Sequence, residues 1–175
     1  MKKTAIAALL GSANIQKKAN LVLKRMKEEN ISLKEAAQVN DHFLEEVYSL
    51  AHAHYERGNY KESLSLFQLL SGIAPSTHKY VFGLSANFHQ MGKFEDAMYG
   101  FYLALNIDPE NPIPAFYIAD CLLKLNFKAE AEEFLNLTIE IAVEKPQYAE
   151  MKHKSLLMLN TLKEGKQYPV SEQQR

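Results

Sequence analysis

The sequence predicts an all-α protein in which three tandem helical hairpins stack into a curved solenoid, with helices before them and a capping helix after them. A six-residue motif recurs at an interval of 34 residues, beginning at Gly58, Gly92 and Asn126. Each copy has a turn residue followed by the start of a helical pattern. A period of this length is typical of solenoids, in which a single unit cannot bury its apolar face alone. We therefore expect the function to lie on the hollow side of the array.

The repeats span residues 44–77, 78–111 and 112–145. Within each unit, the packing positions of the first helix recur at helical spacing. The second helix repeats a small residue, then an aromatic residue, then a proline that ends the helix. The third unit keeps Ala131 and Leu135 but has Asn126 and Val143 in place of the glycine and the proline. The first-helix packing positions are Val47, Leu50, Ala51 and His54, then Val81, Leu84, Ser85 and Phe88, then Ala115, Ile118, Ala119 and Leu122.

This 34-residue pattern resembles the tetratricopeptide repeat. Before it, Ser32 and Glu35 form a capping-box sequence that opens a short helix through Val39, and Asn40 or Asp41 caps the first repeat helix. After it, an apolar stripe predicts a capping helix over 146–164 that covers the last repeat. That stripe consists of Tyr148, Met151, Ser155, Leu156, Leu159 and Leu162. The chain thus divides into a basic arm over 1–30, a repeat domain over 31–165 and a tail over 166–175, which we expect to be flexible.

The composition is that of a folded protein. Of 175 residues, 47% are hydrophobic and 23% are charged, and no apolar run is long enough to span a bilayer. The one cysteine, Cys121, has no partner for an internal disulfide and lies among apolar neighbours. We expect it to be a small buried side chain in a reduced, cytosolic setting.

The N-terminal arm carries an uneven share of the charge. Residues 1–27 hold seven of the 20 basic residues and none of the 21 acidic ones, which leaves a formal charge of −8 on the remainder. Such an arm suits nucleic acid, an anionic membrane, or the acidic body of this chain or of a second copy. No aromatic residues are interleaved with the basic ones, and we expect neither a nucleic acid nor a membrane as partner. Its first residues resemble the start of a signal peptide, but the apolar core is short and an amphipathic pattern follows, so we do not expect export.

The sequence lacks the constellations that catalysis requires. It has no glycine-rich phosphate loop, no Cys-x-x-Cys, no His-Glu-x-x-His and no nucleophile elbow. His52 and His54 are two residues apart, so on a helix they point to different faces. We expect no enzyme activity, no metal site and no cofactor.

A peptide-binding groove is the candidate site. The concave side of such an array is lined by fixed positions of each first helix, where polar residues would be expected. Instead, six of them are apolar or aromatic, which indicates a groove for an extended peptide with aliphatic anchors. The alternative is that a terminal helix folds back and fills the groove. The candidate residues are Tyr48, His52, Tyr55, Phe82, Ala86, His89, Ile113, Phe116, Asp120 and Leu123.

The sequence also resembles a known family over about residues 31–148. The segments that carry the resemblance are 44–51, 55–60, 67–70, 82–84, 90–92, 119–123 and 129–132. They are similar to the class II chaperones of bacterial type III secretion. The resemblance implies a cytoplasmic chaperone that holds hydrophobic, pore-forming translocators by a short extended Pro-x-Leu-x-x-Pro-like segment.

The resemblance places the client pockets on Tyr48, His52, Tyr55 and Phe82. His52 departs from the family pattern, where an aromatic or aliphatic residue is common. The resemblance further implies homodimerisation through the N-terminal region, and some members act with a transcriptional activator when free of client. A scaffold or regulatory adaptor whose groove is closed, or which serves an assembly partner, remains the alternative function. A carboxylate-gripping adaptor is not expected, because its basic and amide positions here hold Tyr48, His52, Gly83, Ile113 and Tyr117.

Overall fold

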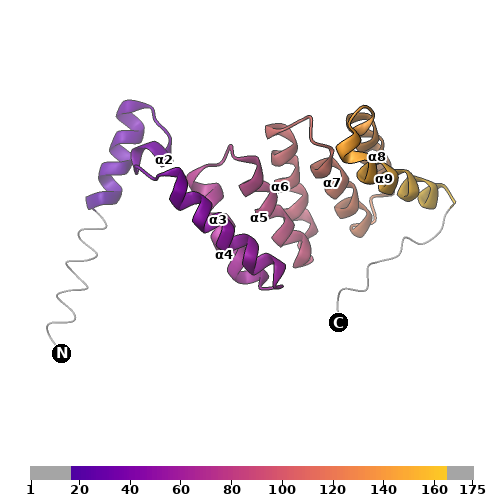
Figure 1. Cartoon of the computed structure of the whole chain (residues 1–175), viewed down its shortest axis with the longest axis horizontal. Helices are drawn as coiled ribbons and strands as arrows, with labels where there is room; N and C mark the ends of the chain where they lie inside the picture. The colour runs from indigo at the N-terminus through magenta and orange to yellow at the C-terminus, as the bar shows by residue number, and fades with distance from the viewer. Residues whose placement is uncertain (1–16, 165–175) are drawn as a thin grey trace.

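The computed structural model describes residues 17–164, and these form a row of helical hairpins (Figure 1). Residues 17–29 are helical, and no strand occurs in the described range. The all-α fold class is confirmed. The elements that follow are α2 (Leu33–Ala36), α3 (Asp41–Glu56), α4 (Tyr60–Ile73), α5 (His78–Gln90), α6 (Phe94–Ile107), α7 (Pro112–Lys124), α8 (Lys128–Ala142), the 3₁₀ turn η1 (Pro146–Tyr148) and α9 (Ala149–Lys163).

The turns inside the hairpins explain why the repeat motif begins with a small residue. Gly58 and Gly92 have φ angles of 76° and 72°, and Asn126 takes the same left-handed conformation with φ of 66°. Glycine adopts this region without steric cost, and asparagine tolerates it better than most residues do. The third hairpin therefore keeps its geometry although it lacks the glycine.

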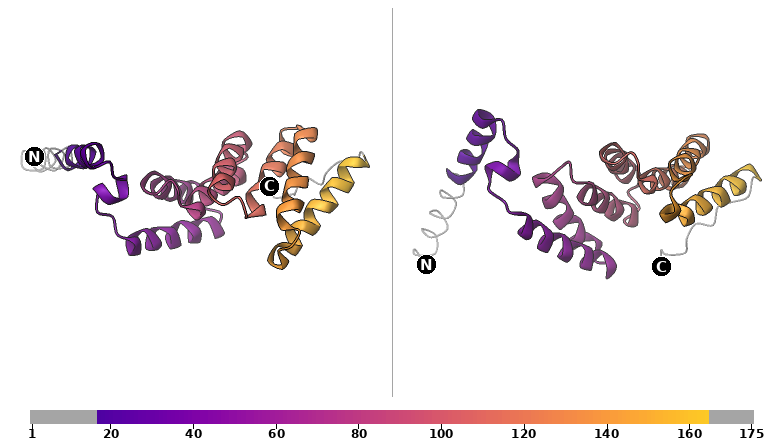
Figure 2. Two further views of the ribbon diagram at one scale, coloured as in Figure 1. Left: turned by 90° about the horizontal axis from the view of Figure 1, so that it is seen from above. Right: turned by 45° about the horizontal axis from the view of Figure 1, so that its top comes forward.

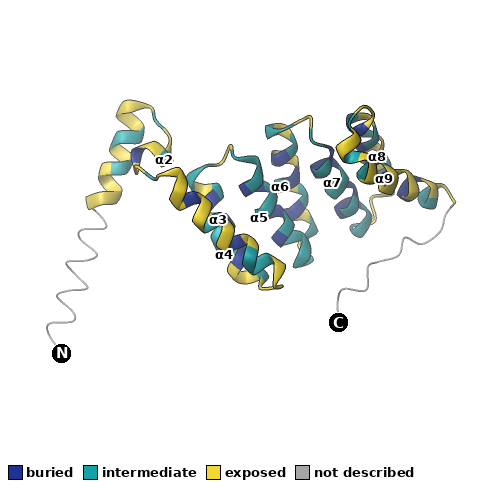
Figure 3. Ribbon diagram, in the orientation of Figure 1, coloured by how far each residue is buried: buried dark blue, intermediate teal, exposed yellow. Residues whose placement is uncertain are grey.

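The core runs between the hairpins (Figure 3). The small residues of the second helices, Ser63, Ala97 and Ala131, have no exposed surface, and Phe101 is equally buried. In one cluster, Ala97 and Phe101 of α6 meet Ile118 and other residues of α7. Small side chains at these crossings let the helices approach closely, and the aromatic rings fill the space beside them.

We expect Ala131→Leu to lower the free energy of unfolding by about 1–3 kcal/mol, because the added volume enters a crossing with no free space. Ala129→Leu is the matched control, since Ala129 is exposed on the same helix. Urea unfolding of both variants checks this. Equal stability of the two would mean that the repeat register is wrong.

The N-terminal helical segment, residues 17–29, lies apart from the solenoid (Figures 1 and 2). The predicted capping box is present at Ser32 and Glu35, and Asn40 caps α3 through a hydrogen bond from the Phe43 amide. The prediction that the short helix continues to Val39 is wrong. It ends at Ala36, because Gln38 adopts a left-handed φ of 57°.

Two predicted packing residues are exposed at the ends of the array. Leu50 is 51% exposed, whereas its counterparts Leu84 and Ile118 pack against the second helix of the preceding repeat. No such helix precedes α3 in the part of the chain that is described. Leu156 is 42% exposed. Two other residues of the predicted stripe, Ser155 and Leu159, are buried, and they share the buried face of α9 with Met158, which the stripe did not include.

The capping helix does cover the last repeat. After η1, α9 packs against α8 and α7, with Met158 and Leu159 in one cluster with Ala119 and Leu135. In α7, burial raises the pKa of the Cys121 thiol to about 12, which leaves it a small neutral core side chain at neutral pH. No helix between residues 17 and 164 is both long and apolar enough to cross a membrane.

Candidate peptide-binding groove

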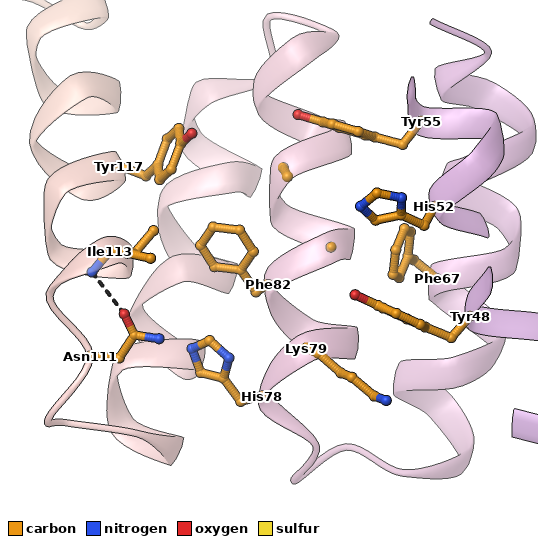
Figure 4. A pocket seen from close by; sticks show the side chains of 12 residues that line it. Tyr48, His52, Tyr55, Phe67, His78, Lys79, Phe82, Asn111, Ile113 and Tyr117 are labelled. Atoms are coloured by element: carbon orange, nitrogen blue, oxygen red, sulfur yellow. Dashed lines mark hydrogen bonds between the residues drawn. The ribbon is translucent and has the colours of Figure 1, made fainter. Parts of the chain in front are cut away.

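A pocket of about 330 Å³ lies at the junction of the first and second repeats and extends to the third (Figure 4). Its walls come from α3, α5 and α7, and α4 contributes one ring. Because first helices of successive repeats lie side by side, the same helix face recurs along the groove. The lining residues are Tyr48, His52, Tyr55, Phe67, His78, Lys79, Phe82, Gly83, Ala86, Asn111, Ile113 and Tyr117.

Helical spacing brings three of these side chains to one wall. Tyr48, His52 and Tyr55 are four and three residues apart on α3, so they share one face. On α5, Phe82 and Ala86 are one turn apart and form the opposite wall. Figure 4 shows the α3 side chains on one side of the pocket and the Phe82 ring on the other, turned toward Ile113 and Tyr117.

Aromatic contacts hold the walls in place. The Tyr48 ring meets Phe67 edge-on, with centroids 5.9 Å apart and planes at 79°. Phe82 lies 5.3 Å from Phe101 and 5.7 Å from Tyr117, centroid to centroid. Such pairs are favourable beyond the area that they bury and restrict ring rotation. The pocket is therefore a preformed apolar surface.

Polar groups lie at one end of the pocket. The Lys79 ammonium donates to Glu45 at 2.6 Å and lies 4.6 Å from the centroid of the Tyr48 ring. The hydrogen bond to Glu45 raises the pKa of Lys79. Asn111 caps α7 by accepting a hydrogen bond from the Ile113 amide at 3.0 Å, and its amide nitrogen points toward His78 (Figure 4).

His78 contributes an apolar face and an unused nitrogen. Its ring stacks on Phe82, with centroids 5.8 Å apart and planes at 15°. Burial lowers the pKa of His78, so the ring is neutral at pH 7. Its Nε2 atom is buried and has no hydrogen-bond partner.

Six of the ten residues predicted for the groove line this pocket: Tyr48, His52, Tyr55, Phe82, Ala86 and Ile113. The other four lie outside it. His89 and Asp120 pair with each other, their Nε2 and Oδ2 atoms 2.6 Å apart, and join α5 to α7.

Phe116 and Leu123 pack against the cluster that includes Met158 and Leu159 of α9. The capping helix therefore covers part of the concave face of the third repeat, and the open pocket belongs mainly to the first two.

The other six lining residues were not among the ten candidates. Phe67 was assigned to the core by its position in the repeat, and the first-helix position that Tyr117 and Gly83 share was considered only for an adaptor that grips a carboxylate. His78 and Asn111 lie where helices begin, outside the periodic pattern. Lys79 occupies a concave position of its first helix, so its charge could have predicted the polar end of the pocket.

The chemistry of the site is that of recognition. An open, aromatic pocket with a few polar groups at one end can hold an apolar side chain and orient the backbone beside it. In residues 17–164, no group of three or more His, Cys, Asp or Glu side chains is arranged to hold a metal ion.

Fold and pocket together define a tetratricopeptide-repeat protein with an open aromatic groove on its concave face. The family model for the tetratricopeptide repeat matches residues 88–154. The chain is 30% identical over 126 residues to low calcium response locus protein H of Yersinia pseudotuberculosis, covering 72% of this chain and 75% of that protein. The chain belongs to the family of low calcium response locus protein H.

Solved structures agree with this assignment. A crystal structure of SycD, the type III secretion translocator chaperone of Yersinia enterocolitica, in an alternative dimer, matches with a TM-score of 0.71 and 30% identity, covering 74% of this chain and 98% of SycD. SycD in complex with a peptide of the translocator YopD matches with a TM-score of 0.70 and 30% identity, over 74% and 98% of the two chains.

Proposed function

We propose that the protein is a type III secretion chaperone of the bacterial cytoplasm that binds an extended segment of hydrophobic translocator proteins in its concave groove. The client would thereby stay soluble and competent for secretion. The observation that carries the proposal is the aromatic pocket between α3 and α5, in a member of a family in which SycD binds a translocator peptide. The proposal assigns the protein no catalytic activity.

The pocket chemistry fits a short Pro-x-Leu-x-x-Pro-like segment. An extended chain presents alternate side chains to the wall that it lies on, and the rings of Tyr48, Phe67 and Phe82 form an apolar receptor for one aliphatic side chain. Burying that side chain contributes about 1.5–3 kcal/mol. The Asn111 amide, which lines the pocket, offers a hydrogen bond to the backbone beside it.

The alternative, a scaffold with a closed groove, finds less support. Among residues 17–164, none from the N-terminal helical segment or from α9 lines the pocket. A groove serving an assembly partner or a transcriptional activator would use the same surface.

Co-expression tests the function directly. Each membrane-active secretion substrate of the source bacterium is expressed with and without the chaperone, and its soluble fraction is measured. We expect at least one substrate to become soluble and to co-purify as a complex. Recovery of only soluble assembly components would support the scaffold, and failure to solubilise any substrate would contradict the chaperone.

We also propose that the N-terminal segment holds a second copy of the chain; SycD, a similar protein, has been solved as a dimer. Residues 17–29 are helical and expose Leu21 and Leu23 by 58% and 62%, while Arg25 anchors the segment by donating to the Ala36 carbonyl at 2.9 Å. Neither leucine belongs to one of the apolar clusters of the described solenoid.

We expect Leu21→Asp with Leu23→Asp to shift the protein from dimer to monomer, because a charge on each leucine cannot be buried against a partner. Sedimentation equilibrium at two salt concentrations measures this, with Leu157→Asp on α9, which is 53% exposed, as control. Identical sedimentation of both variants and the wild type would contradict dimerisation through this segment.

A further inference from the structure

One position of the first helix differs in kind between the repeats. At the shared interval of 34 residues it is occupied by Ser49, Gly83 and Tyr117. In the second and third repeats this position faces the aromatic residue of the preceding second helix, which is Phe67 for Gly83 and Phe101 for Tyr117. The two junctions therefore offer a direct comparison of glycine with tyrosine at one structural site.

At the junction of the second and third repeats, the tyrosine covers the ring beneath it. Tyr117 stacks on Phe101, with centroids 5.1 Å apart and planes at 19°, and Phe101 has no exposed surface. The rings of Phe82 and His89 also contact the Phe101 ring. The groove wall here consists of two aromatic layers, and the outer one fills the space that a client side chain would need.

At the junction of the first and second repeats, the glycine removes that outer layer. A Cβ atom at Gly83 would lie 2.2 Å from Cε1 and 2.4 Å from Cζ of Phe67, so the ring rests directly against the backbone of α5. Phe67 then lines the pocket together with Tyr48 and Phe82. Any side chain at position 83 would displace the ring from this place, and the pocket would lose depth.

We propose that Gly83 is the specificity-determining residue of the groove. By letting Phe67 rest against the backbone of α5, it creates a receptor for a large aliphatic anchor and places that anchor at the junction of the first two repeats. The contrast with Tyr117 explains why the corresponding place one repeat later is filled. The inference rests on the proposed peptide-binding function and adds which residue sets the size of the accepted side chain.

The test compares two anchors in each variant. The probes are a short fluorescein-labelled peptide with one Pro-Ala-Leu-Ala-Ala-Pro segment and the same peptide with alanine in place of leucine. Fluorescence anisotropy gives the ratio of the two dissociation constants for the wild type, Gly83→Ala and Gly72→Ala. Gly72 is the matched control, because it is an exposed helical glycine and a Cβ atom there would meet nothing within 4 Å. The ratio is insensitive to partial unfolding, since both peptides sample the same folded fraction.

We expect the wild type and Gly72→Ala to prefer the leucine peptide by about 10- to 100-fold, as burial of one leucine predicts. Gly83→Ala should reduce this preference to less than about 5-fold, because a displaced ring blocks the larger anchor.

Phe67→Leu should enlarge the pocket, whereas Gly83→Ala should reduce it. We therefore expect Phe67→Leu to raise the affinity for a methionine-anchored peptide relative to the leucine peptide. An unchanged preference in Gly83→Ala overturns the role of Gly83 while leaving peptide binding intact. A wild type that shows no preference between the two peptides overturns the proposed groove function itself.

Discussion

Truncation of the groove aromatics is expected to weaken client binding by about 1–3 kcal/mol for either Tyr48→Ala or Phe82→Ala, the usual effect of removing an aromatic contact from an interface centre. Both rings line the pocket and are held by neighbouring rings. Isothermal titration with a client peptide, at a temperature where the variants are folded, measures the loss.

Tyr99→Ala is the matched control for these variants. Tyr99 lies on α6 outside the pocket and is 69% exposed, so its removal should change affinity by less than about 0.5 kcal/mol. Unchanged binding in both groove variants, or a loss in Tyr99→Ala of the same size, would place the client elsewhere on the molecule.

Removal of the Phe101 ring, which lies between the second and third repeats, is expected to have the largest effect on the free energy of unfolding. Phe101 is fully buried, stacks on Tyr117 and packs in one cluster with Ala97 and Ile118. Phe101→Ala should lower the free energy of unfolding by about 3–5 kcal/mol, because it removes apolar contacts and leaves a cavity that stacked repeats cannot close.

Phe127→Ala gives the comparison for the same residue type. Phe127 precedes α8 and is 51% exposed, so we expect a change within about 0.5 kcal/mol. Urea unfolding of the two variants separates the positions. Similar stabilities would show that the core does not run between the repeats as described.

The fold was predictable because its determinants are local and repeated. Gly58, Gly92 and Asn126 mark the three turns, and each adopts the left-handed conformation that the repeat needs. The small residues of the second helices recur at the same interval and are buried. A pattern that occurs three times identifies the packing face even where one copy is degraded.

The ends of the array were less predictable, because a repeat pattern says nothing about which neighbours are missing. Leu50 occupies a packing position but has no preceding repeat to pack against, so it is exposed. On α9, which lies outside the repeats, the predicted stripe correctly included Ser155 and Leu159 but also included the exposed Leu156 and omitted the buried Met158. Both errors concern tertiary packing at the ends of the array, which the repeat pattern does not encode.

The pocket residues were predictable where their places follow from the repeat register. Tyr48, His52 and Phe82 follow from helix position alone, and they line the pocket. The places of Phe116 and Leu123 depend on where α9 packs, which is a tertiary contact that the repeat register does not encode. Gly83 has no side chain to suggest a role, and its importance appears only when the distance to Phe67 is known.

The central claim is that the client segment lies in the concave groove against the α3 and α5 walls. Nuclear Overhauser contacts between the leucine methyl groups of a bound Pro-x-Leu-x-x-Pro peptide and the aromatic protons of the chaperone test it most directly. We predict contacts to Tyr48, Phe67 and Phe82, which line the pocket, and none to Tyr99 or Tyr102, which are exposed on α6 outside it. Contacts to Tyr99 and Tyr102, with none to the pocket rings, would contradict the account.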